Sequence, residues 1–253
     1  MKNSVEKKTR VFENSLYGAK WVAKQIADLI KHKALKDENC VLGLATGGTP
    51  LEVYNELIRF HKEEGLSFSN VITFNLDEYY PIQPEDIKSY NHFMYENLFE
   101  HIDVLAENIN IPKGNVPEKQ VNEYCVNYDE KIKACGGIDI QLLGIGRTGH
   151  IGFNEPGSDI DSNTRFVVLN DVTRTDAIAQ FKNKDLVPFY AITMGVRTIM
   201  SSKRILLMAW GKNKAEIINK AIRIEITNEI PATFLQKHNN VEFVLDKLAA
   251  NEL

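Results

Sequence analysis

Cysteine is scarce in this sequence, and no two cysteines are spaced as a pair. Cys40, Cys125 and Cys135 lie far apart along the 253 residues, and their number is odd. This spacing argues against a disulfide framework and against a cysteine-based zinc site, and it favours the reducing cytoplasm as the location. None of the six histidines lies at ligand spacing from another. We therefore expect no metal site.

Long hydrophobic runs and an excess of charge of either sign are also missing. Residues 1–15 contain no apolar core of signal-peptide length, and no apolar run approaches the ~20 residues needed to span a bilayer. The net charge is −4, so bulk charge favours neither nucleic acid nor a membrane as a partner. A local cluster of hydrogen-bond donors can still bind a phosphorylated small molecule.

The sequence does contain an alternation of short apolar runs with segments of helical spacing. Apolar positions recur with helical period in residues 14–36, whereas the runs at 41–45, 71–75 and 204–209 are typical of buried strands. This alternation predicts an α/β fold in which helices cover both faces of a mainly parallel sheet. No repeat or linker interrupts it, so we expect a single domain over residues 1–253 with a three-layer, Rossmann-like architecture. Further strands are expected at 109–111, 166–169, 190–194 and 241–245, the last with a short helix behind it.

Residues 142–156 are the stretch around which the predicted sheet is organised. A buried apolar run ends there in a glycine-rich loop that contains His150 and Glu155. Glycine allows sharp turns and close approach to a ligand, and histidine transfers protons near neutral pH. Taken alone, the motif is equally compatible with a structural turn that carries a solvated histidine.

A second glycine-rich turn follows the first predicted strand and reads Thr46-Gly47-Gly48-Thr49-Pro50. Pro50 fits the first turn of the next helix, with Thr49 as its N-cap. A strand, a glycine-rich turn and a capped helix together present free backbone N–H groups and a helix dipole to a phosphate. A plain βα turn is the alternative, because the motif matches neither the Walker A pattern nor the dinucleotide fingerprint.

An acidic pair, Asp77 and Glu78, directly follows the predicted strand at 71–75 and precedes Tyr79 and Tyr80. Partial burial beside the tyrosines would raise the pKa of a carboxyl group toward the range of a general base. Surface acids that cap a strand end are the alternative interpretation.

The carboxyl ends of the predicted strands bring these motifs together. Lys214 follows the strand at 204–209 just as the other motifs follow their own strands. The carboxyl ends of parallel strands share one edge of a sheet, where ligands bind. The glycine-rich turn, Asp77, the His150 loop and Lys214 are therefore expected to meet in one active site.

These motifs together resemble those of the glucosamine-6-phosphate deaminases, within a larger group that includes 6-phosphogluconolactonase and ribose-5-phosphate isomerase. FNLDEYY together with GHIGFNEP is specific to the deaminases, whereas the lactonases share the GH but not FNEP. The matching segments keep the family's order and spacing over nearly the whole chain. They are LGLATGGTP (42–50), VITFNLDEYY (71–80), SYNHFM (89–94), AENINIP (106–112), GHIGFNEPGS (149–158) and WGKNKA (210–215).

The resemblance implies that glucosamine 6-phosphate and water are converted to fructose 6-phosphate and ammonium. It assigns to His150 the proton transfer that opens the sugar ring, with Glu155 orienting the imidazole and stabilising its charged form. Asp77 would move a proton from C2 to C1, shielded from bulk water. The backbone of residues 46–49 and Lys214 would hold the phosphate. The reaction needs no metal and no organic cofactor.

Two positions depart from the family pattern near the expected site. Thr148 lies two residues before His150, where the best-known members carry Asp and others carry Asn. We include Thr148 among the expected catalytic residues, because its hydroxyl can form a hydrogen bond, although it cannot add a charge beside His150 and Glu155. The family's phosphate-binding Arg aligns with Ala179. Arg174 or Arg197 is then the candidate replacement.

Regulation and assembly are also addressed by the resemblance. The allosteric site of some members keeps its Arg at Arg165, with Ser158 nearby, but Val167 replaces its Lys, which argues against regulation by N-acetylglucosamine 6-phosphate. The chain ends at Leu253, short of the C-terminal helix of many relatives, as expected for a domain cut from a longer protein. Family assemblies range from monomer to hexamer, so a homo-oligomer is among the expected states.

Two other functions stay open at the level of sequence. One is a shifted substrate on the same scaffold, such as another amino-sugar phosphate, or a simple isomerase or lactonase activity, which Thr148 and Ala179 motivate. The other is a sugar-phosphate-binding regulatory domain without turnover. Retention of Asp77, His150 and Glu155 argues against a pure binder, which needs no general base.

Overall fold

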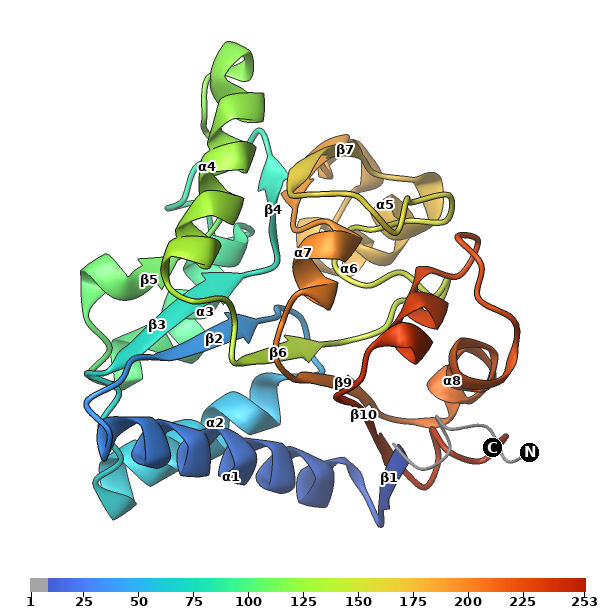
Figure 1. Ribbon diagram of the computed structural model, residues 1–253. Coiled ribbons are helices and arrows are strands. Elements are labelled where there is room, and N and C mark those ends of the chain that lie inside the picture. Colours follow the sequence, from blue (N-terminus) through green and yellow to red (C-terminus); the bar gives the residue numbers. More distant parts are fainter. Residues whose placement is uncertain (1–8) are drawn as a thin grey trace.

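A seven-stranded parallel sheet forms the centre of the computed structural model, which describes residues 9–253 (Figure 1). The strand order is β1-β10-β9-β6-β2-β3-β5, and every neighbouring pair in it is parallel. The prediction of a mainly parallel sheet is confirmed. The strands are β1 Thr9–Phe12, β2 Cys40–Leu44, β3 Val71–Asn75, β5 Ile109–Asn110, β6 Ile140–Leu143, β9 Ile205–Ala209 and β10 Val241–Asp246.

Helices cover both faces of this sheet, and successive residues of each strand point to opposite cores. Leu42 of β2 packs into the core on one face, together with α1 and α2, whereas Val41 packs into the core on the other, together with α4 and α8. Burial on both sides explains why strands such as β2 and β9 are continuous buried runs. The helices are α1 Ser15–Ala34, α2 Leu51–Glu64, α3 Tyr90–Asn97, α4 Val121–Ala134, α7 Val196–Met200 and α8 Ala215–Arg223.

A second, three-stranded antiparallel sheet stands beyond the carboxyl edge of the large one and was not predicted. It consists of β4 (Asp77–Tyr80), β8 (Tyr190–Thr193) and β7 (Arg165–Val168), in the order β4-β8-β7. The expectation that the acidic pair ends a strand is corrected, because β4 begins at Asp77 after the single residue Leu76. The apolar runs near 166 and 190 are strands as predicted, but they belong to this smaller sheet.

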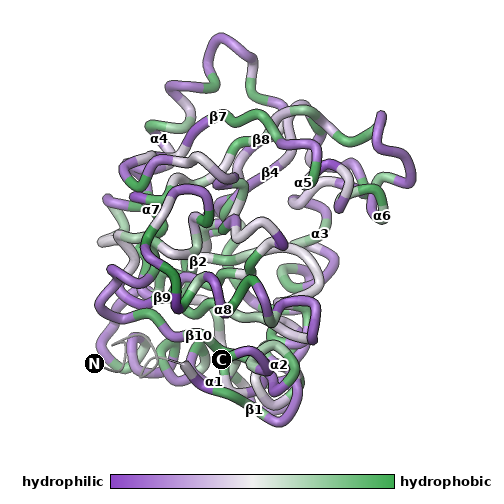
Figure 2. The backbone as a smooth tube through the Cα atoms, turned by 90° about the vertical axis from the view of Figure 1, so that its right-hand side faces the viewer, coloured by the Kyte–Doolittle hydropathy of each residue, from purple (hydrophilic) through white to green (hydrophobic). Residues whose placement is uncertain are grey.

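Two short helices connect β7 to β8 and lie beside the small sheet. They are α5 (Asp171–Asp176) and α6 (Ile178–Phe181). Figure 2 shows this α5–α6 segment projecting from the body of the molecule on the side of α3, with hydrophilic turns at its outer end. The segment therefore borders the carboxyl edge of the large sheet without belonging to its core.

Three local predictions differ from the structure. Pro50, not Thr49, is the N-cap of α2, and it makes no side-chain capping bond; the carbonyl of Thr49 instead accepts from the indole of Trp210. Residues 247–252 form turns rather than the short helix expected after β10. The edge strand β1 was not predicted, because it is only four residues long and none of its side chains is fully buried.

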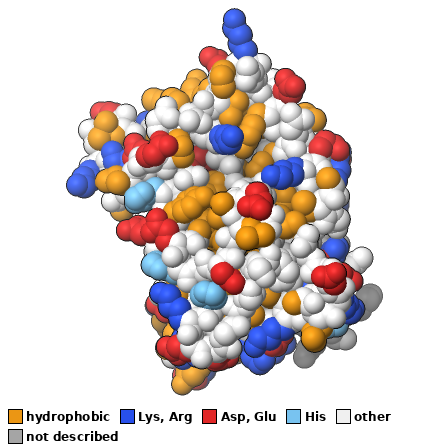
Figure 3. All heavy atoms as spheres, turned by 90° about the vertical axis from the view of Figure 1, so that its left-hand side faces the viewer, with side chains coloured by type: hydrophobic (Ala, Val, Ile, Leu, Met, Phe, Trp, Pro, Cys, Tyr) orange, Lys and Arg blue, Asp and Glu red, His pale blue; other side chains and the backbone are white. Residues whose placement is uncertain are grey.

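The surface agrees with the balanced charge of the sequence. Lysine, arginine and acidic side chains are interspersed over the face that Figure 3 shows. Within residues 9–253, no helix combines the length and the apolar character that a membrane span requires.

Candidate active site

Three of the predicted motifs line one cavity of about 180 Å³ at the carboxyl edge of the large sheet. They are the turn after β2, the start of β4 and the loop after β6. The prediction that separate loops converge at this edge therefore agrees with the structure. The cavity is lined by Ala45, Thr46, Gly47, Gly48, Thr49, Leu76, Asp77, Tyr90, Gly144, Ile145, Gly146, His150, Gly152 and Phe153.

The turn at residues 46–49, here called the phosphate loop, is held at both ends and open in the middle. The hydroxyl of Tyr54 donates to the carbonyl of Ala45 at 2.5 Å, and Trp210 Nε1 donates to the carbonyl of Thr49 at 3.0 Å. A Cβ built on Gly47 or Gly48 would meet no atom within 4 Å, and Gly47 has a φ of 91°. The two glycines therefore leave the backbone accessible to an anion.

Asp77 is a buried carboxylate in the lining of the cavity, with 6% of its surface exposed. Its burial, and secondarily the charge of Glu78, raise the pKa of Asp77 to about 8, while a backbone hydrogen bond from Phe153 opposes the shift. The side chain lies close to the glycine-rich loop, because a Cβ on Gly152 would come within 3.3 Å of Asp77 Oδ2. A carboxyl group with such a pKa is suited to general base catalysis near neutral pH.

Glu78 turns away from this cavity and caps a helix. Its carboxylate accepts the backbone N–H groups of Tyr90 and Asn91 at the start of α3 and that of the adjacent Tyr79, each at 2.9 Å. Burial raises the pKa of Glu78 to about 7, although these three bonds act in the opposite direction. With only 1% of its surface exposed, Glu78 is a buried structural acid rather than the surface acid considered above.

His150 lies in the cavity with hydrogen-bonding side chains around its Nδ1. Thr148 Oγ1 is 3.0 Å from Nδ1 and Glu155 Oε2 is 3.5 Å from it, while Asn170 Nδ2 donates to the same carboxylate oxygen at 2.6 Å. The Nε2–Cε1 edge of the ring packs over Gly146, where a Cβ would come within 2.2 Å of both atoms. Glycine at 146 therefore allows the imidazole to take this position.

Lys214 lines a second cavity of about 510 Å³ that adjoins the first at Tyr90, Gly146, His150 and Phe153. Its Nζ donates to the carbonyl of Ile145 at 2.7 Å. Burial lowers the pKa of Lys214, and the nearby carboxylate of Asp176 opposes this shift.

Glu155 lines neither of these two cavities; it lies behind His150 on the wall of a third. Arg165 and Ser158 line the same third cavity. Arg165 Nη1 donates to Asn154 Oδ1 at 2.8 Å, and its Nη2 donates to Ser158 Oγ at 3.2 Å. The side chain expected from the allosteric match is thus already engaged within its own chain, and Val167 lies beside it in the same lining.

Arg174 and Arg197, the candidate replacements for the family arginine that aligns with Ala179, lie outside the two cavities around His150. Arg174 is buried and donates to the carbonyls of Lys184 and Val187, at 3.0 and 3.1 Å. Arg197 pairs with a surface aspartate, at 3.2 Å. Neither lines the two cavities around His150, which corrects that expectation, because both guanidinium groups are committed to other partners.

Three residues of the site were not assigned by sequence reasoning. Tyr90 and Phe153 form an aromatic wall of the first cavity, with ring centroids 6.0 Å apart and planes at 12°. Tyr90 lies within SYNHFM, so its signal was present in a matching segment. Arg147 lines the second cavity, but its sequence neighbours give no indication that it differs from an ordinary loop arginine.

The chemistry available to these residues is acid–base and electrostatic. In residues 9–253, no group of three or more His, Cys, Asp or Glu side chains could hold a metal ion. An open glycine-rich backbone turn, a buried carboxylate and a histidine at the carboxyl edge of a parallel sheet are typical of an α/β enzyme site.

The chain belongs to the family of glucosamine-6-phosphate isomerases/6-phosphogluconolactonase, whose model matches residues 16–244. It is 46% identical to the glucosamine-6-phosphate deaminase of a Thermoanaerobacter species, covering 91% of this chain and 90% of that protein. It is also 44% identical to a putative glucosamine-6-phosphate deaminase-like protein of Bacteroides thetaiotaomicron. That match covers 97% of this chain but only 37% of the longer Bacteroides protein.

The fold is also similar to solved structures of the same family. A monomeric glucosamine-6-phosphate deaminase has a TM-score of 0.93 and 43% identity, covering 97% of this chain and all of the other. The 6-phosphogluconolactonase of Trypanosoma brucei has a TM-score of 0.76 with 18% identity over 97% of this chain and 98% of the other. The second similarity concerns the fold alone.

Proposed function

We propose that this chain converts glucosamine 6-phosphate and water to fructose 6-phosphate and ammonium. The observation that carries the proposal is one cavity that contains the buried carboxylate of Asp77, the imidazole of His150 and the open phosphate loop. The names of the relatives that are about 46% identical over most of their length support the same activity.

Ring opening is assigned to His150. The bound sugar is a hemiacetal, so opening it requires a proton to leave O1 and a proton to reach O5. An imidazole whose Nδ1 is flanked by Thr148 and Glu155 keeps its other nitrogen for this transfer. Glu155 stabilises the imidazolium form, and Asn170 fixes the carboxylate in place.

Proton transfer between carbons is assigned to Asp77. The carboxylate removes the proton from C2 of the open aldehyde, and the electron pair moves to form the C1–C2 enol. O1 is protonated as the C2 ammonium group gives up one proton, and return of the Asp77 proton to C1 of this enamine leaves an iminium group at C2. Water adds there and expels ammonia, so that a ketone remains at C2. A base with a pKa raised by burial suits a weakly acidic C–H, because it is a stronger base than an exposed carboxylate.

The phosphate is assigned to the phosphate loop and Lys214. Backbone N–H groups around Gly47 and Gly48 and the N-terminal end of α2 supply donors and positive potential. Lys214 supplies a formal positive charge from the adjoining cavity. The substrate partner of the protein is thus an amino-sugar phosphate.

The test is incubation of the purified protein with glucosamine 6-phosphate while fructose 6-phosphate and ammonium are measured together. Equal formation of both products, lost in Asp77→Asn with unchanged circular dichroism, supports the proposal. Because glucosamine 6-phosphate carries an amino group at C2, fructose 6-phosphate cannot form from it without release of ammonium. A folded protein that forms neither product contradicts the assignment. Full activity of Asp77→Asn would remove Asp77 from the role of base.

We propose the cytoplasm as the location of this reaction. Cys40, Cys125 and Cys135 are all free thiols, as expected for a reducing compartment. Localisation of a tagged chain in the cell tests the proposed location. Size-exclusion chromatography of the purified protein separately tests the expected homo-oligomer against a monomer.

A further inference from the structure

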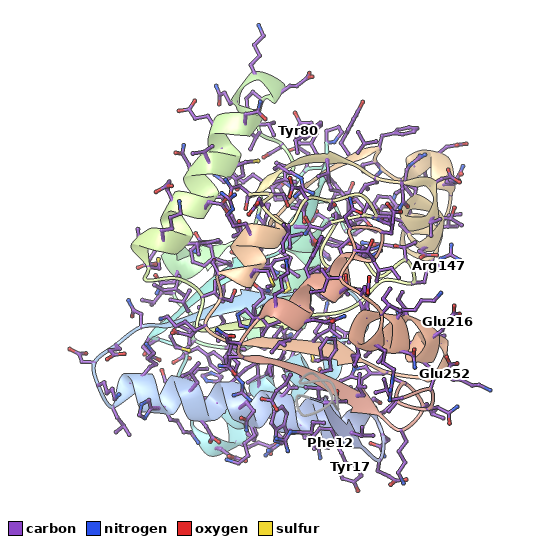
Figure 4. All side chains as sticks on the ribbon, turned by 45° about the vertical axis from the view of Figure 1, so that its right-hand side comes forward. Phe12, Tyr17, Tyr80, Arg147, Glu216 and Glu252 are labelled. Carbon is purple, nitrogen blue, oxygen red and sulfur yellow. The ribbon has the colours of Figure 1, made fainter. Side chains whose placement is uncertain are left out.

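Two cationic side chains, Arg147 and Lys214, line the cavity beside His150. Lys214 stands at the start of α8, and Arg147 belongs to the glycine-rich loop after β6. In Figure 4, Arg147 lies at the edge of the molecule, above the helix α8 that carries Glu216. The two cations therefore reach one cavity from two different elements, and the phosphate loop borders the adjoining one.

A carboxylate from the α5–α6 segment forms an ion pair with the guanidinium of Arg147. Asp176 Oδ1, at the end of α5, lies 3.0 Å from Arg147 Nη2. The same carboxylate acts electrostatically on Lys214. The side chains of the pair are 56% and 47% exposed, so this bond contributes little to folding. Its partner groups are accessible to a ligand.

We propose that Arg147 is a phosphate-binding residue that acts with Lys214, and that Asp176 occupies its guanidinium until a phosphate replaces the carboxylate. The inference rests on the proposed function for the identification of the ligand as a sugar phosphate. A phosphate dianion carries more charge than a carboxylate and offers three acceptor oxygens to a planar guanidinium fork. The exchange of partners therefore favours the phosphate.

The same exchange frees the end of α5. Arg147 is a link from the loop beside His150 to the segment that carries Asp176, and the residues Thr173, Ala177 and Gln180 of that segment line the cavity. Arrival of the phosphate at Arg147 breaks this link. Arg147 thereby selects phosphorylated substrates and couples their binding to this segment.

The experiment measures binding of inorganic phosphate by calorimetry, and separately kcat and KM for glucosamine 6-phosphate. The variants are Arg147→Ala, Asp176→Asn and the double variant. The matched control is Arg197→Ala, which removes another exposed arginine that is paired with an aspartate, Asp161, away from the cavity.

Arg147→Ala is expected to weaken phosphate binding and to raise KM, each by about tenfold or more, with a much smaller change in kcat. Asp176→Asn is expected to tighten phosphate binding by about two- to fivefold, because the competing carboxylate is lost. This gain disappears in the double variant, since the competition requires the guanidinium of Arg147.

Equal phosphate affinity of Arg147→Ala and Arg197→Ala would overturn the inference, as would a wild-type protein that binds no phosphate. Unchanged affinity in Asp176→Asn would overturn the competition between carboxylate and phosphate. Phosphate binding is measured without turnover. A wild-type protein that binds phosphate through Arg147 yet releases no ammonium would therefore support this inference and contradict the proposed function.

Discussion

Asp77 and Glu78 are adjacent carboxyl groups that meet different surroundings because side chains alternate along a strand. Asp77 faces the first cavity, and Glu78 accepts two backbone N–H groups at the N-terminus of α3 and a third from its neighbour Tyr79. Of the two, Asp77 lines the cavity that also contains His150, whereas Glu78 lines a separate cavity beside α3. The division of roles thus follows from the position of β4, which the sequence alone did not reveal.

The raised pKa of Asp77 predicts the pH dependence of activity. A base must be ionised to accept a proton, so kcat/KM is expected to rise with pH and to level off above a value near 8. Initial rates at low substrate concentration across pH 5 to 10 give this profile. An acid limb near the ordinary aspartate pKa of about 4 would contradict the predicted environment.

The same pKa predicts that Asp77 costs stability. Its folded-state pKa lies above the unfolded value, so the folded state binds the proton more tightly and loses stability as pH rises from about 4 to about 8. Asp77→Asn does not titrate and is expected to be more stable than wild type by an amount that grows over this range and is constant above it. Urea unfolding of both proteins at pH 4, 6 and 9 measures the difference. A difference independent of pH would show that Asp77 keeps an ordinary pKa.

Thr148 provides a third prediction for single residues. Thr148→Val keeps the shape but removes the hydroxyl that lies 3.0 Å from His150 Nδ1, so kcat is expected to fall by about tenfold, the loss of one hydrogen bond. Thr148→Ser keeps the hydroxyl and serves as the control, with nearly full activity expected. Equal kcat values for the two variants would contradict a role of the Thr148 hydroxyl in orienting His150. Glu155 would then be the side chain that orients the imidazole.

At the scale of elements, the sequence predicted the large sheet better than the small one. Strands such as β2 and β9 are continuous buried runs, each followed within three residues by a glycine, and both features are local. The small sheet instead pairs Asp77 with Thr193, more than a hundred residues apart, and no local pattern reports such a pairing. The phosphate loop was predicted from its glycines, but Thr49 was assigned as the cap in place of Pro50, because a helix boundary that differs by one residue leaves no clear local signal.

Two glycines at the ends of elements predict opposite results for the same substitution. Gly48→Ala places a Cβ where no atom lies within 4 Å, so stability is expected to be unchanged while KM rises, because the methyl group stands over the phosphate loop. Gly195→Ala at the start of α7 places a Cβ 2.1 Å from the carbonyl oxygen of Ser162 and 2.2 Å from that of Asn163. The expected loss is roughly 1–3 kcal/mol. Thermal melts and KM values of both variants check this pair, and a destabilised Gly48→Ala would contradict it.

At the scale of the whole molecule, the site joins the two sheets. The phosphate loop and His150 extend from the large sheet, and Asp77 belongs to the small one, with Leu76 alone between β3 and β4. Movement of one sheet against the other would therefore displace the base from the substrate. The expected single domain over residues 1–253 stays a prediction, and the longer Bacteroides relative shows that such a chain also occurs as part of a larger protein.

A ligand that contacts both sheets is expected to stabilise the whole protein. Fructose 6-phosphate at about 100 times its dissociation constant adds about 2.7 kcal/mol, which corresponds to a rise in Tm of roughly 5 °C or more for a chain of this size. Differential scanning fluorimetry with and without the sugar phosphate measures the shift, and unphosphorylated fructose is the control. A transition in which only part of the protein responds would contradict the coupling of the two sheets.

The hydrogen bond from Trp210 to Thr49 gives the protein a built-in optical reporter. The indole emits light with an intensity and wavelength that depend on its immediate surroundings, and its N–H group is tied to the end of the phosphate loop. Occupation of that loop will therefore be visible as a change in intrinsic emission, without any attached dye. Because the other tryptophan, Trp21, lies on α1, a Trp21→Phe protein would assign this signal to Trp210 and allow substrate arrival to be followed in stopped-flow experiments.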